Sequence, residues 1–503
     1  MGRWIRADAK DTAVIEDTRK DLVGYLERLD KSDLTGLQKC WGYQYMVLPK
    51  MKWVLAIYDI PLSTVQRWEQ TTNKFLRSWL RAGHTLSRRC LFSRDSCVAL
   101  PIDSILDTWK VEKCRLQQSY NTSNDNFVTS IEPKVRSGRA WTTEKALDDA
   151  KRDLECEAMQ GMTQPQFRAG IGFGEWAKPW ERMSDKEKNE AIIGRVKENI
   201  EKDTRSQYGL LEMHSIWATW RGAVIAMDLS WNNMFQVGDS LLGFALRVVY
   251  GTVITPSFKS KWDAEEDGNC KLCSVERGTI QHILSGCSKA LEQKRYTWRH
   301  DKVLKQIYNQ VLYHVEQRVN NPRRSTTRTE GEKIKFVGPG EKVESSLTKR
   351  RDYSNMGIMT AAKDWKVLVD LDKQFTFPQE VQVQTDLRPD LIMYSNSIKR
   401  IIWWELTCPV EENISKNHDK KLDKYAELQV DCQTAGWSCF NVAIEVGARG
   451  FAAESLQRAA TAIGIRGRAV KKLVREAGQE AMHCSRWIYW LSEKKEWETR
   501  NVA

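Results

Sequence analysis

The sequence predicts an α-helical first half, then a small metal-binding knuckle, then an α/β domain. Three observations predict this order. Apolar residues recur at helical spacing in several stretches before residue 250. A close group of three cysteines and one histidine follows. After residue 353, short β-rich runs bounded by turn residues alternate with helical patterns. The chain's 503 residues have room for roughly three domains.

The charge balance indicates a polyanionic partner, DNA or RNA. Lys and Arg number 78 against 66 Asp and Glu, a formal net charge of +12, and the pI is near 9.0. The alternative is a basic surface that is only solvated. Trp is frequent, at 21 of 503 residues. Together with Arg it suits stacking on nucleic-acid bases, although many Trp residues would also serve a core.

Residues 1–115 predict a helical domain. In PLSTVQRWEQTTNKFLRSWLRAG, one helix is expected between Pro61 and Gly83, with its apolar stripe formed by Val65, Trp68, Phe75, Leu76, Trp79 and Leu80. Four basic residues lie mostly off this stripe: Arg67, Lys74, Arg77 and Arg81. We expect this basic face to contact nucleic-acid phosphates; the alternative is an ordinary solvated face.

The remaining chain divides by composition. Residues 116–262 predict a helical connector, with charged helices near 142–160 and 184–205. A knuckle with its following helix is expected at 263–319, and a flexible basic linker, poor in aliphatic residues, at 320–352. Residues 353–465 predict the α/β domain, and 466–503 a basic C-terminal helix. The expected strands are FTFPQEVQVQT, LIMY, IKRIIWWEL and CFNVAIEV.

The segment CKLCSVERGTIQHILSGC predicts a structural zinc site. It places Cys270, Cys273, His282 and Cys287 as C-x2-C-x8-H-x4-C. Two thiolates separated by two residues can hold one edge of a tetrahedron, and the later His and Cys complete it. Four protein ligands close the site to substrate; the alternative is buried thiols beside a surface histidine. The following RYTWRHD offers Arg295, Arg299 and His300 beside aromatic rings, where we expect nucleic-acid contacts.

A hairpin is expected in LRPDLIMYSNSIKRIIWWELTCP, from Leu387 to Pro409. Asp390 begins its first strand, and Glu405 lies in the most apolar part of the second. A buried carboxylate is unfavourable unless it is paired or binds a cation. Because Mg2+ and Mn2+ accept carboxylate oxygens, we expect both acids to hold such an ion. With a turn centred on Asn396, Asp390 lies opposite residue 402, so a bulge or stagger is needed.

Basic side chains for this site are expected on the next helix, ISKNHDKKLDKYAELQ, which begins near Ile414. Lys421 and Lys424 lie one helical turn apart, and Tyr425 adjoins them. The alternatives for the hairpin remain open. An Asp after Pro is often a turn residue, and a lone acid in a strand is often the partner of a basic side chain.

In their order along the chain, these motifs resemble a known family. The cysteine–histidine group, RHD at 299–301, RPD at 388–390, the acid at 405 and the lysine–tyrosine helix resemble the C-terminal portion of a non-LTR retrotransposon reverse transcriptase/endonuclease polyprotein. GRWI at 2–5 and the 61–83 helix resemble the end of that family's palm and its thumb, and VVYGTVITPSFKSKW at 248–262 its connector. The resemblance touches nearly the whole chain, through motifs that are short.

The resemblance implies a PD-(D/E)xK restriction-like nuclease domain. Its catalytic set would be Asp390, Glu405 and either Lys421 or Lys424, with Tyr425 in support. Glu445, in VAIEVGARGF, would be a further candidate. Thr407 occupies the place where many such nucleases have a lysine, so a helix lysine would have to replace it. The chain has no FADD-like or YADD-like pair of aspartates, so no independent reverse transcriptase activity is expected.

The expected function is therefore a Mg2+- or Mn2+-dependent DNA endonuclease that nicks a target strand. Its partners would be DNA or RNA, with a reverse transcriptase acting in trans. One alternative is a catalytically inactive, zinc-dependent nucleic-acid-binding module, and another is a translated remnant without independent function. Because no secretion signal and no apolar run of about 18 residues occurs, a soluble nuclear or cytoplasmic protein is expected.

Overall fold

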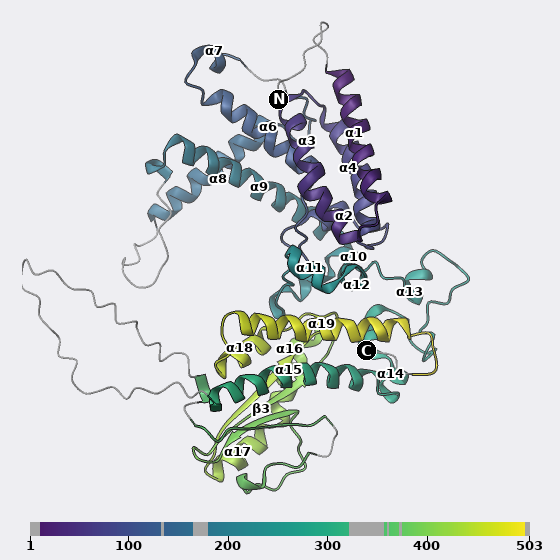
Figure 1. The fold of residues 1–503 in the computed structure, drawn as a ribbon, viewed down its shortest axis with the longest axis vertical. Coiled ribbons are helices and arrows are strands. Elements are labelled where there is room, and N and C mark those ends of the chain that lie inside the picture. Colours follow the sequence, from purple (N-terminus) through teal and green to yellow (C-terminus); the bar gives the residue numbers. More distant parts are fainter. Residues whose placement is uncertain are drawn as a thin grey trace, which may run out of the picture. The chain divides into compact units, whose positions relative to one another are not determined.

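The computed structural model describes residues 11–131, 135–163, 180–320, 357–359, 362–371 and 375–497. These residues are mostly helical, with one small mixed sheet late in the chain (Figure 1). Two compact units result: the first unit is Met1–Ala218 with Asp228–Thr252, and the second unit is Thr219–Met227 with Val253–Ala503. The boundary expected at residue 115 falls inside helix α6, so residues 11–115 and most of the segment 116–262 share the first unit.

The first unit is built from amphipathic helices. Helix α4 (Leu62–Trp79) begins directly after Pro61 and buries Val65, Trp68 and Leu76, as its apolar stripe predicts. The two charged helices predicted in the connector are α8 (Thr143–Thr163) and α9 (Asp185–Gly209), and both are confirmed. The other helices are α1 (Thr12–Lys31), α2 (Gly36–Gly42), α3 (Leu48–Ile57), α5 (Arg88–Phe92), α6 (Ile105–Asn121), α7 (Asn126–Thr129), α10 (Glu212–Ser215), α11 (Trp231–Val237) and α12 (Asp239–Val249).

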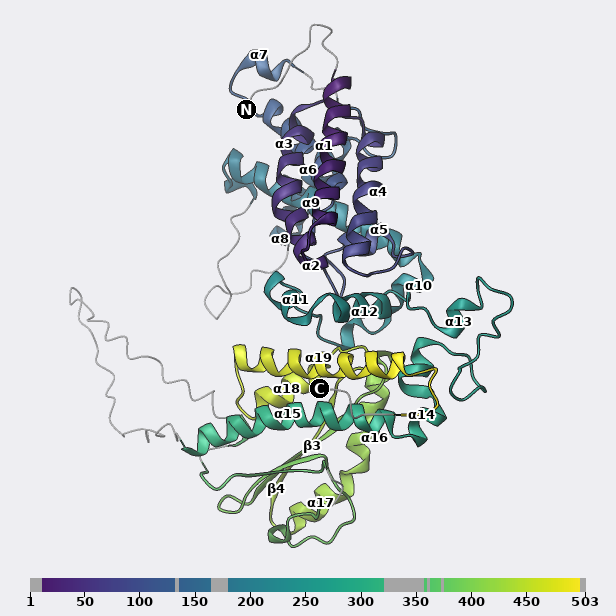
Figure 2. The ribbon, with the colours of Figure 1, turned by 45° about the vertical axis from the view of Figure 1, so that its right-hand side comes forward.

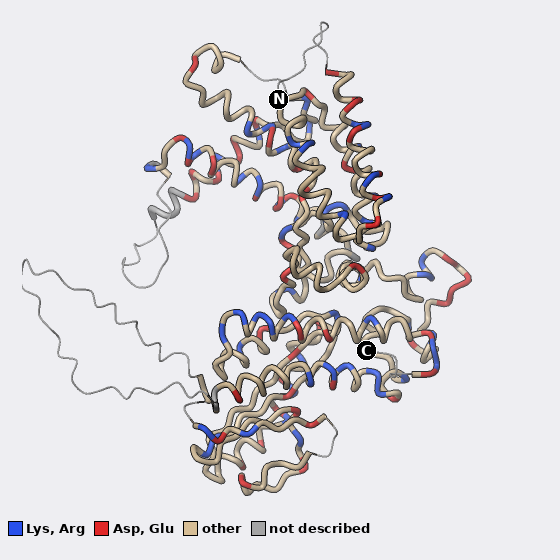
Figure 3. Tube along the Cα trace, viewed as in Figure 1, with Lys and Arg blue, Asp and Glu red and all other residues tan. Residues whose placement is uncertain are grey.

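The second unit combines the cysteine–histidine segment with a four-stranded sheet and its covering helices. The strands are β1 (Lys366–Val369), β2 (Leu391–Ser395), β3 (Arg400–Thr407) and β4 (Ser438–Glu445). The helices are α13 (Pro256–Lys259), α14 (Ser288–Glu292), α15 (Arg295–Asn320), α16 (Ile414–Lys424), α17 (Ala426–Thr434), α18 (Glu454–Ala462) and α19 (Arg468–Trp490). Helix α19 is the basic C-terminal helix that the sequence predicts (Figure 3).

The sheet has the order β1-β2-β3-β4. The first three strands are antiparallel neighbours, whereas β4 runs parallel to β3. A parallel neighbour needs a crossover connection, and α16 and α17 form it between β3 and β4. The three strands expected after residue 390 are therefore confirmed.

Alternate residues of the strands fill two separate cores, one on each face of the sheet. On one face, Leu391 and Trp404 pack with Val303 of α15 and Leu473 of α19. Figures 1 and 2 show α15 and α19 side by side across this face. On the other face, Ile392 and Trp403 pack with Tyr425 and Leu428, at the junction of α16 and α17 and within α17.

The strand expected from FTFPQEVQVQT is wrong. Residues 375–385 contain only a short 3-10 turn, Gln379–Val381. Pro378 precedes this turn and has no N–H to donate to a neighbouring strand, and Gln382 has a φ of 60°, outside the range of strands. The sheet is completed by β1 instead, which the sequence interpretation missed.

Several predicted segments lie outside the described residues. These are GRWI at 2–5 and, apart from Asn320, the linker at 320–352. No described helix combines the length with the apolar character that crossing a membrane requires.

Candidate functional site

Three acidic residues lie at one level of the sheet. Leu391 pairs with Trp404, so continuing the register by one residue sets Asp390 opposite Glu405. Val369 pairs with Leu391, which likewise sets Asp370 opposite Asp390. Directly opposed residues of antiparallel strands point to the same face. Asp370, Asp390 and Glu405 therefore form a row across three adjacent strands, here called the acid row.

The hairpin register corrects one sequence expectation. Ser395 pairs with Arg400, so the turn is Asn396–Lys399 and not a turn centred on Asn396. Lys399 adopts a φ of 45°, which closes this four-residue turn. Asp390 thus faces Glu405 directly, and its N–H donates to Glu405 Oε2 over 3.3 Å. No bulge is needed.

Glu405 is almost fully buried and is held by helix α16. Lys421 Nζ lies 2.6 Å from Glu405 Oε1, and Lys424 Nζ lies 3.2 Å from the same oxygen. The Tyr425 hydroxyl lies 2.8 Å from Glu405 Oε2. Burial raises the pKa of Tyr425 well above its ordinary value, and the charge of Glu405 raises it further, so Tyr425 stays protonated and can donate. The structure thus brings together Glu405, Lys421, Lys424 and Tyr425, which the sequence analysis expected at one site.

The Asp390 carboxylate is bound by one group from β3 and one from α15. Its Oδ2 accepts the backbone N–H of Leu406 over 2.7 Å and lies 3.2 Å from His300 Nε2. The other ring nitrogen of His300 lies 3.0 Å from Asp301 Oδ1. Burial lowers the pKa of His300, but the hydrogen bonds to Asp301 and Asp390 outweigh it and raise the pKa to about 10. His300 is therefore an imidazolium that orients Asp390, and its expected contact with nucleic acid stays a prediction.

A cavity of about 340 Å³ opens beside Asp390. Four carboxylates line it together with basic groups from α15 and α16: Thr297, His300, Asp301, Asp370, Asp386, Leu387, Arg388, Asp390 and Lys424. Sequence reasoning missed Asp370 and Asp386. Asp370 directly follows the β-rich run KVLV. An acid at the end of a β-rich run is a signal for a functional site, so the sequence offered a way to find Asp370.

Glu445 does not join the acid row. It ends β4 beside Thr407, and its carboxylate contacts His418 Nδ1 at 2.9 Å and the Ser455 hydroxyl. These residues line a separate cavity of about 220 Å³. Thr407 lies two residues after Glu405 on the same strand face and carries no charge. The positively charged side chains near Glu405 are therefore the lysines of α16.

The cysteine–histidine group could hold a metal ion, and its ligand types suit zinc. One ligand atom from each of Cys270, Cys273, His282 and Cys287 lies within 4.8 Å of the others. Among the described residues, it is the one group of three or more Cys, His, Asp or Glu side chains that converge in this way. His282 begins the π-helical turn His282–Gly286 and Cys287 directly follows it, and this wider turn brings positions five apart toward one side.

A carboxylate outside the group orients its histidine. The Glu276 carboxylate lies 2.9 Å from His282 Nδ1, which directs Nε2 toward Cys273 Sγ, 3.4 Å away. Burial raises the pKa of Cys273, but hydrogen bonds from the backbone N–H groups of Glu276 and Val275 outweigh it and lower the pKa to about 6. A thiolate at neutral pH is the form that binds a metal.

Arg295 and Arg299 correct a further expectation. Arg295 is 0% and Arg299 1% exposed. Arg295 donates to the backbone carbonyls of Leu491 and Lys494, and Arg299 to those of Leu284 and Cys408. Buried guanidinium groups that join α15 to distant backbone cannot reach a nucleic acid on the surface. Arg295 joins α15 to the segment that follows α19, and Arg299 joins the cysteine–histidine segment to the end of β3.

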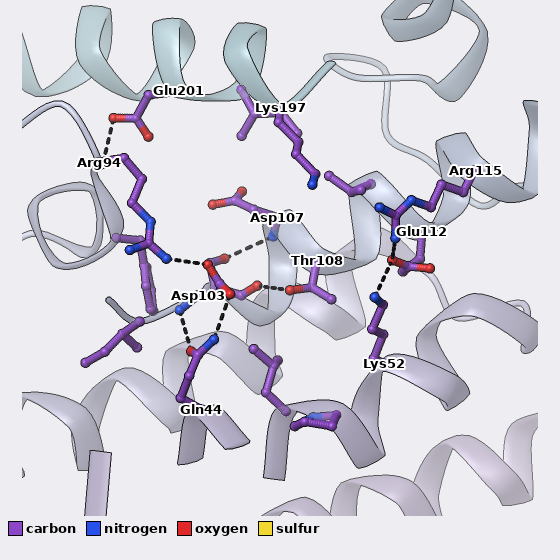
Figure 4. A pocket seen from close by; sticks show the side chains of 17 residues that line it. Gln44, Lys52, Arg94, Asp103, Asp107, Thr108, Glu112, Arg115, Lys197 and Glu201 are labelled. Carbon is purple, nitrogen blue, oxygen red and sulfur yellow. Dashed lines mark hydrogen bonds and ion pairs between the residues drawn. The ribbon is translucent and has the colours of Figure 1, made fainter. Parts of the chain in front are cut away.

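The basic face of α4 is only partly available. Arg67, Lys74 and Arg81 are exposed, and phosphate contact by them stays a prediction. Arg77 is half-buried, and burial lowers its pKa. A cavity of about 520 Å³ lies elsewhere in the first unit. Its basic groups are largely paired, Arg94 with Asp103 and both Lys52 and Arg115 with Glu112 (Figure 4). It offers no comparable reactive centre.

No model of a known protein family matches the chain, and neither does any curated protein. The functional interpretation therefore depends on the geometry of the acid row and the metal-binding group.

Proposed function

We propose that the second unit is a Mg2+- or Mn2+-dependent DNA endonuclease of the PD-(D/E)xK restriction-like class, as in the retrotransposon polyproteins that the sequence resembles. One observation carries the proposal: Asp390 and Glu405 lie opposite each other on adjacent strands, with Lys421 2.6 Å from Glu405. A buried acid opposite a half-buried one, beside a cavity and a lysine, is an arrangement more common at functional sites than in a purely structural hairpin. Helices on both faces of a mixed sheet support the same class.

The ligand types at this position suit a hard divalent cation, although the three carboxylates of the acid row do not converge in the way that the cysteine–histidine group does. Asp390 and Glu405 offer carboxylate oxygens, and Asp370 adds a third carboxylate at the same register position. When bound, such an ion neutralises developing charge on a phosphodiester and makes an attacking water more acidic. Asp390 is pre-positioned for this role by Leu406 N–H and His300, and Tyr425 fixes the orientation of Glu405.

The lysines would act on the phosphate. Lys421 is the better candidate, because its Nζ is closer to Glu405 than that of Lys424 and its side chain is 28% exposed against 43%. A cation held this rigidly stabilises the charge that builds on the scissile phosphate without further reorganisation. By the family resemblance, the biological act would be nicking a target strand to prime reverse transcription, with the polymerase supplied in trans.

A second candidate is supported by the same residues. Glu405 is already neutralised by Lys421 and Lys424 and hydrogen-bonded to Tyr425, so the hairpin can be stable without any ion. In that case the protein would be an inactive nucleic-acid-binding module in which the metal-binding knuckle and α4 contact the partner. Both candidates include a structural zinc ion and salt-sensitive binding of nucleic acid.

Nicking of supercoiled plasmid by the purified chain separates the two candidates. The reaction is run with Mg2+, with Mn2+ and with EDTA, for the wild type and the Asp390→Ala, Glu405→Ala double variant. Glu427→Gln, which changes an exposed acid of α17, is the matched control. Nicking that needs the metal and is lost only in the double variant supports the nuclease. A folded wild type that binds DNA and does not nick it supports the inactive module.

A further inference from the structure

The first unit carries exposed aromatic rings on a helix whose other face is buried. Helices α2 and α3 join through the π-helical turn Tyr43–Val47 into one helical run from Gly36 to Ile57. The inner face buries residues such as Leu37, Cys40, Val47, Met51 and Leu55. The outer face carries Trp41, Tyr45 and Trp53, which are 42%, 52% and 47% exposed. The outer face of a helix is ordinarily polar, so exposed aromatic rings on it indicate a binding surface.

Two of the rings continue onto a neighbouring helix. The ring centroids of Trp41 and Tyr45 are 5.2 Å apart, and Tyr45 lies 6.0 Å from Trp231 of α11. Trp231 lies 6.1 Å from Phe235, which is 45% exposed. These four residues, here called the aromatic row, are thus consecutive neighbours drawn from two segments far apart in the sequence. All of them belong to the first unit.

The charge around the aromatic row has one sign along its main helix. Residues 36–57 contain no acidic residue and three lysines. Lys52 is paired with Glu112 of α6, so Lys39 and Lys50 remain without an acidic side-chain partner among the ion pairs of the described residues. Segment 231–237 of α11 has no charged residue at all. The π-helical turn lies within the row, at Tyr45, and such turns often occur at functional sites. An anionic partner with flat apolar faces fits this combination better than an aliphatic protein surface does.

We propose that the aromatic row binds single-stranded nucleic acid, with unpaired bases stacking on Trp41, Tyr45 and Phe235 and with Lys39 and Lys50 of the same helix near the phosphates. Every base has a π-face, so stacking of this kind tolerates any sequence. The site lies in the first unit and needs neither the acid row nor a divalent cation. It therefore extends the proposed endonuclease function and does not depend on it.

The test measures binding, without added Mg2+ or Mn2+, of a fluorescein-labelled oligothymidylate of about 15 nucleotides. The Trp41→Ala, Tyr45→Ala double variant is expected to bind about tenfold or more weakly, whereas Trp41→Phe with Tyr45→Phe retains most of the affinity. The matched control is Phe127→Ala, which removes a ring that is 73% exposed on α7 of the same unit. Thermal unfolding of each variant checks that the fold is intact.

An abasic strand of equal length separates stacking from charge. The wild type is expected to bind the abasic strand more weakly than oligothymidylate. The alanine variant is expected to bind the abasic strand with the same affinity as the wild type does. Equal binding of both strands by the wild type, or unchanged oligothymidylate binding by the alanine variant, overturns the proposal. A third result also overturns it: the wild type self-associates, the alanine variant does not, and the wild type binds oligothymidylate no better than the abasic strand. The aromatic row would then be a protein interface.

Discussion

Asp370 and Asp390 face each other across β1 and β2, and the backbone N–H of Asp370 donates to the carbonyl oxygen of Asp390 over 3.0 Å. This bond continues the strand ladder by one pair and fixes Asp370 at the register position of Asp390 and Glu405. The Asp370 side chain is only 9% exposed and lines the cavity beside Asp390. Asp370 is therefore a third carboxylate in line with the proposed cation site at Asp390 and Glu405.

Asp370→Asn is expected to weaken Mn2+ binding about tenfold or more and to slow plasmid nicking, because one of three carboxylates at the site is lost. Calorimetric titration with Mn2+ provides a readout that does not require nicking. Asp386→Asn is the control, since Asp386 lines the same cavity and lies outside the strand ladder. Equal effects of the two variants would show that general negative charge, and not the row, matters.

Lys421→Ala is expected to lower the nicking rate by roughly 100-fold, the usual loss when one preorganised donor to a charged transition state is removed. Lys424→Ala should cost less, because Lys424 is more exposed and also contacts the Tyr425 hydroxyl at 2.8 Å. Single-turnover nicking rates of the two variants provide the comparison. A larger loss in Lys424→Ala would assign the role to the other lysine.

The purified chain is expected to contain one zinc ion, and removing it with a chelator should lower the melting temperature. Cys270→Ser should abolish the bound zinc, whereas Glu276→Gln should weaken zinc binding about 10-fold to 100-fold by releasing His282. Elemental analysis and chelator competition measure both effects. Cys156→Ser, at an exposed free cysteine, should leave the zinc content unchanged.

Asp364 links stability to pH at the β2–β3 turn. Its carboxylate accepts hydrogen bonds from the Ser395 hydroxyl at 2.6 Å and from the Ser397 N–H at 2.8 Å. Burial raises the pKa of Asp364, but these hydrogen bonds outweigh it and hold the pKa well below its ordinary value. A lowered native pKa stabilises the fold above the unfolded pKa, and this contribution is lost as the pH falls below it.

Asp364→Asn should therefore lower the free energy of unfolding by about 1 kcal/mol or less at neutral pH, since the site is partly exposed. The difference from the wild type should shrink below about pH 4. Urea unfolding at a series of pH values measures it, with the exposed Asp431→Asn as control. A difference that grows on acidification would contradict this assignment.

The sequence predicted what depends on local pattern. A metal-binding group is predictable from the spacing of Cys270, Cys273, His282 and Cys287 alone. The apolar runs of the hairpin likewise predict where Asp390 and Glu405 lie. The lysine helix followed from its own periodicity. These signals need only a few neighbouring residues to be interpreted.

Long-range features could not be predicted in the same way. The residues of the turn Asn396–Lys399 allow several registers, and only packing of the sheet on both faces selects the one that aligns the acids. Arg299 looks like a surface residue in RYTWRHD, and its burial depends on the carbonyls of Leu284 and Cys408. Asp370 joins the site through a strand of only four residues, β1, which is too short for a clear periodic signal.

The most direct test is the initial rate of metal-dependent plasmid nicking by Asp390→Asn, which replaces one carboxylate oxygen and keeps the side-chain shape. The acid row as a nuclease centre predicts a loss of nicking to the level of the metal-free reaction, with the Glu427→Gln control unchanged. Nicking by Asp390→Asn at the wild-type rate would contradict it, and the opposed acids would then be a structural pair.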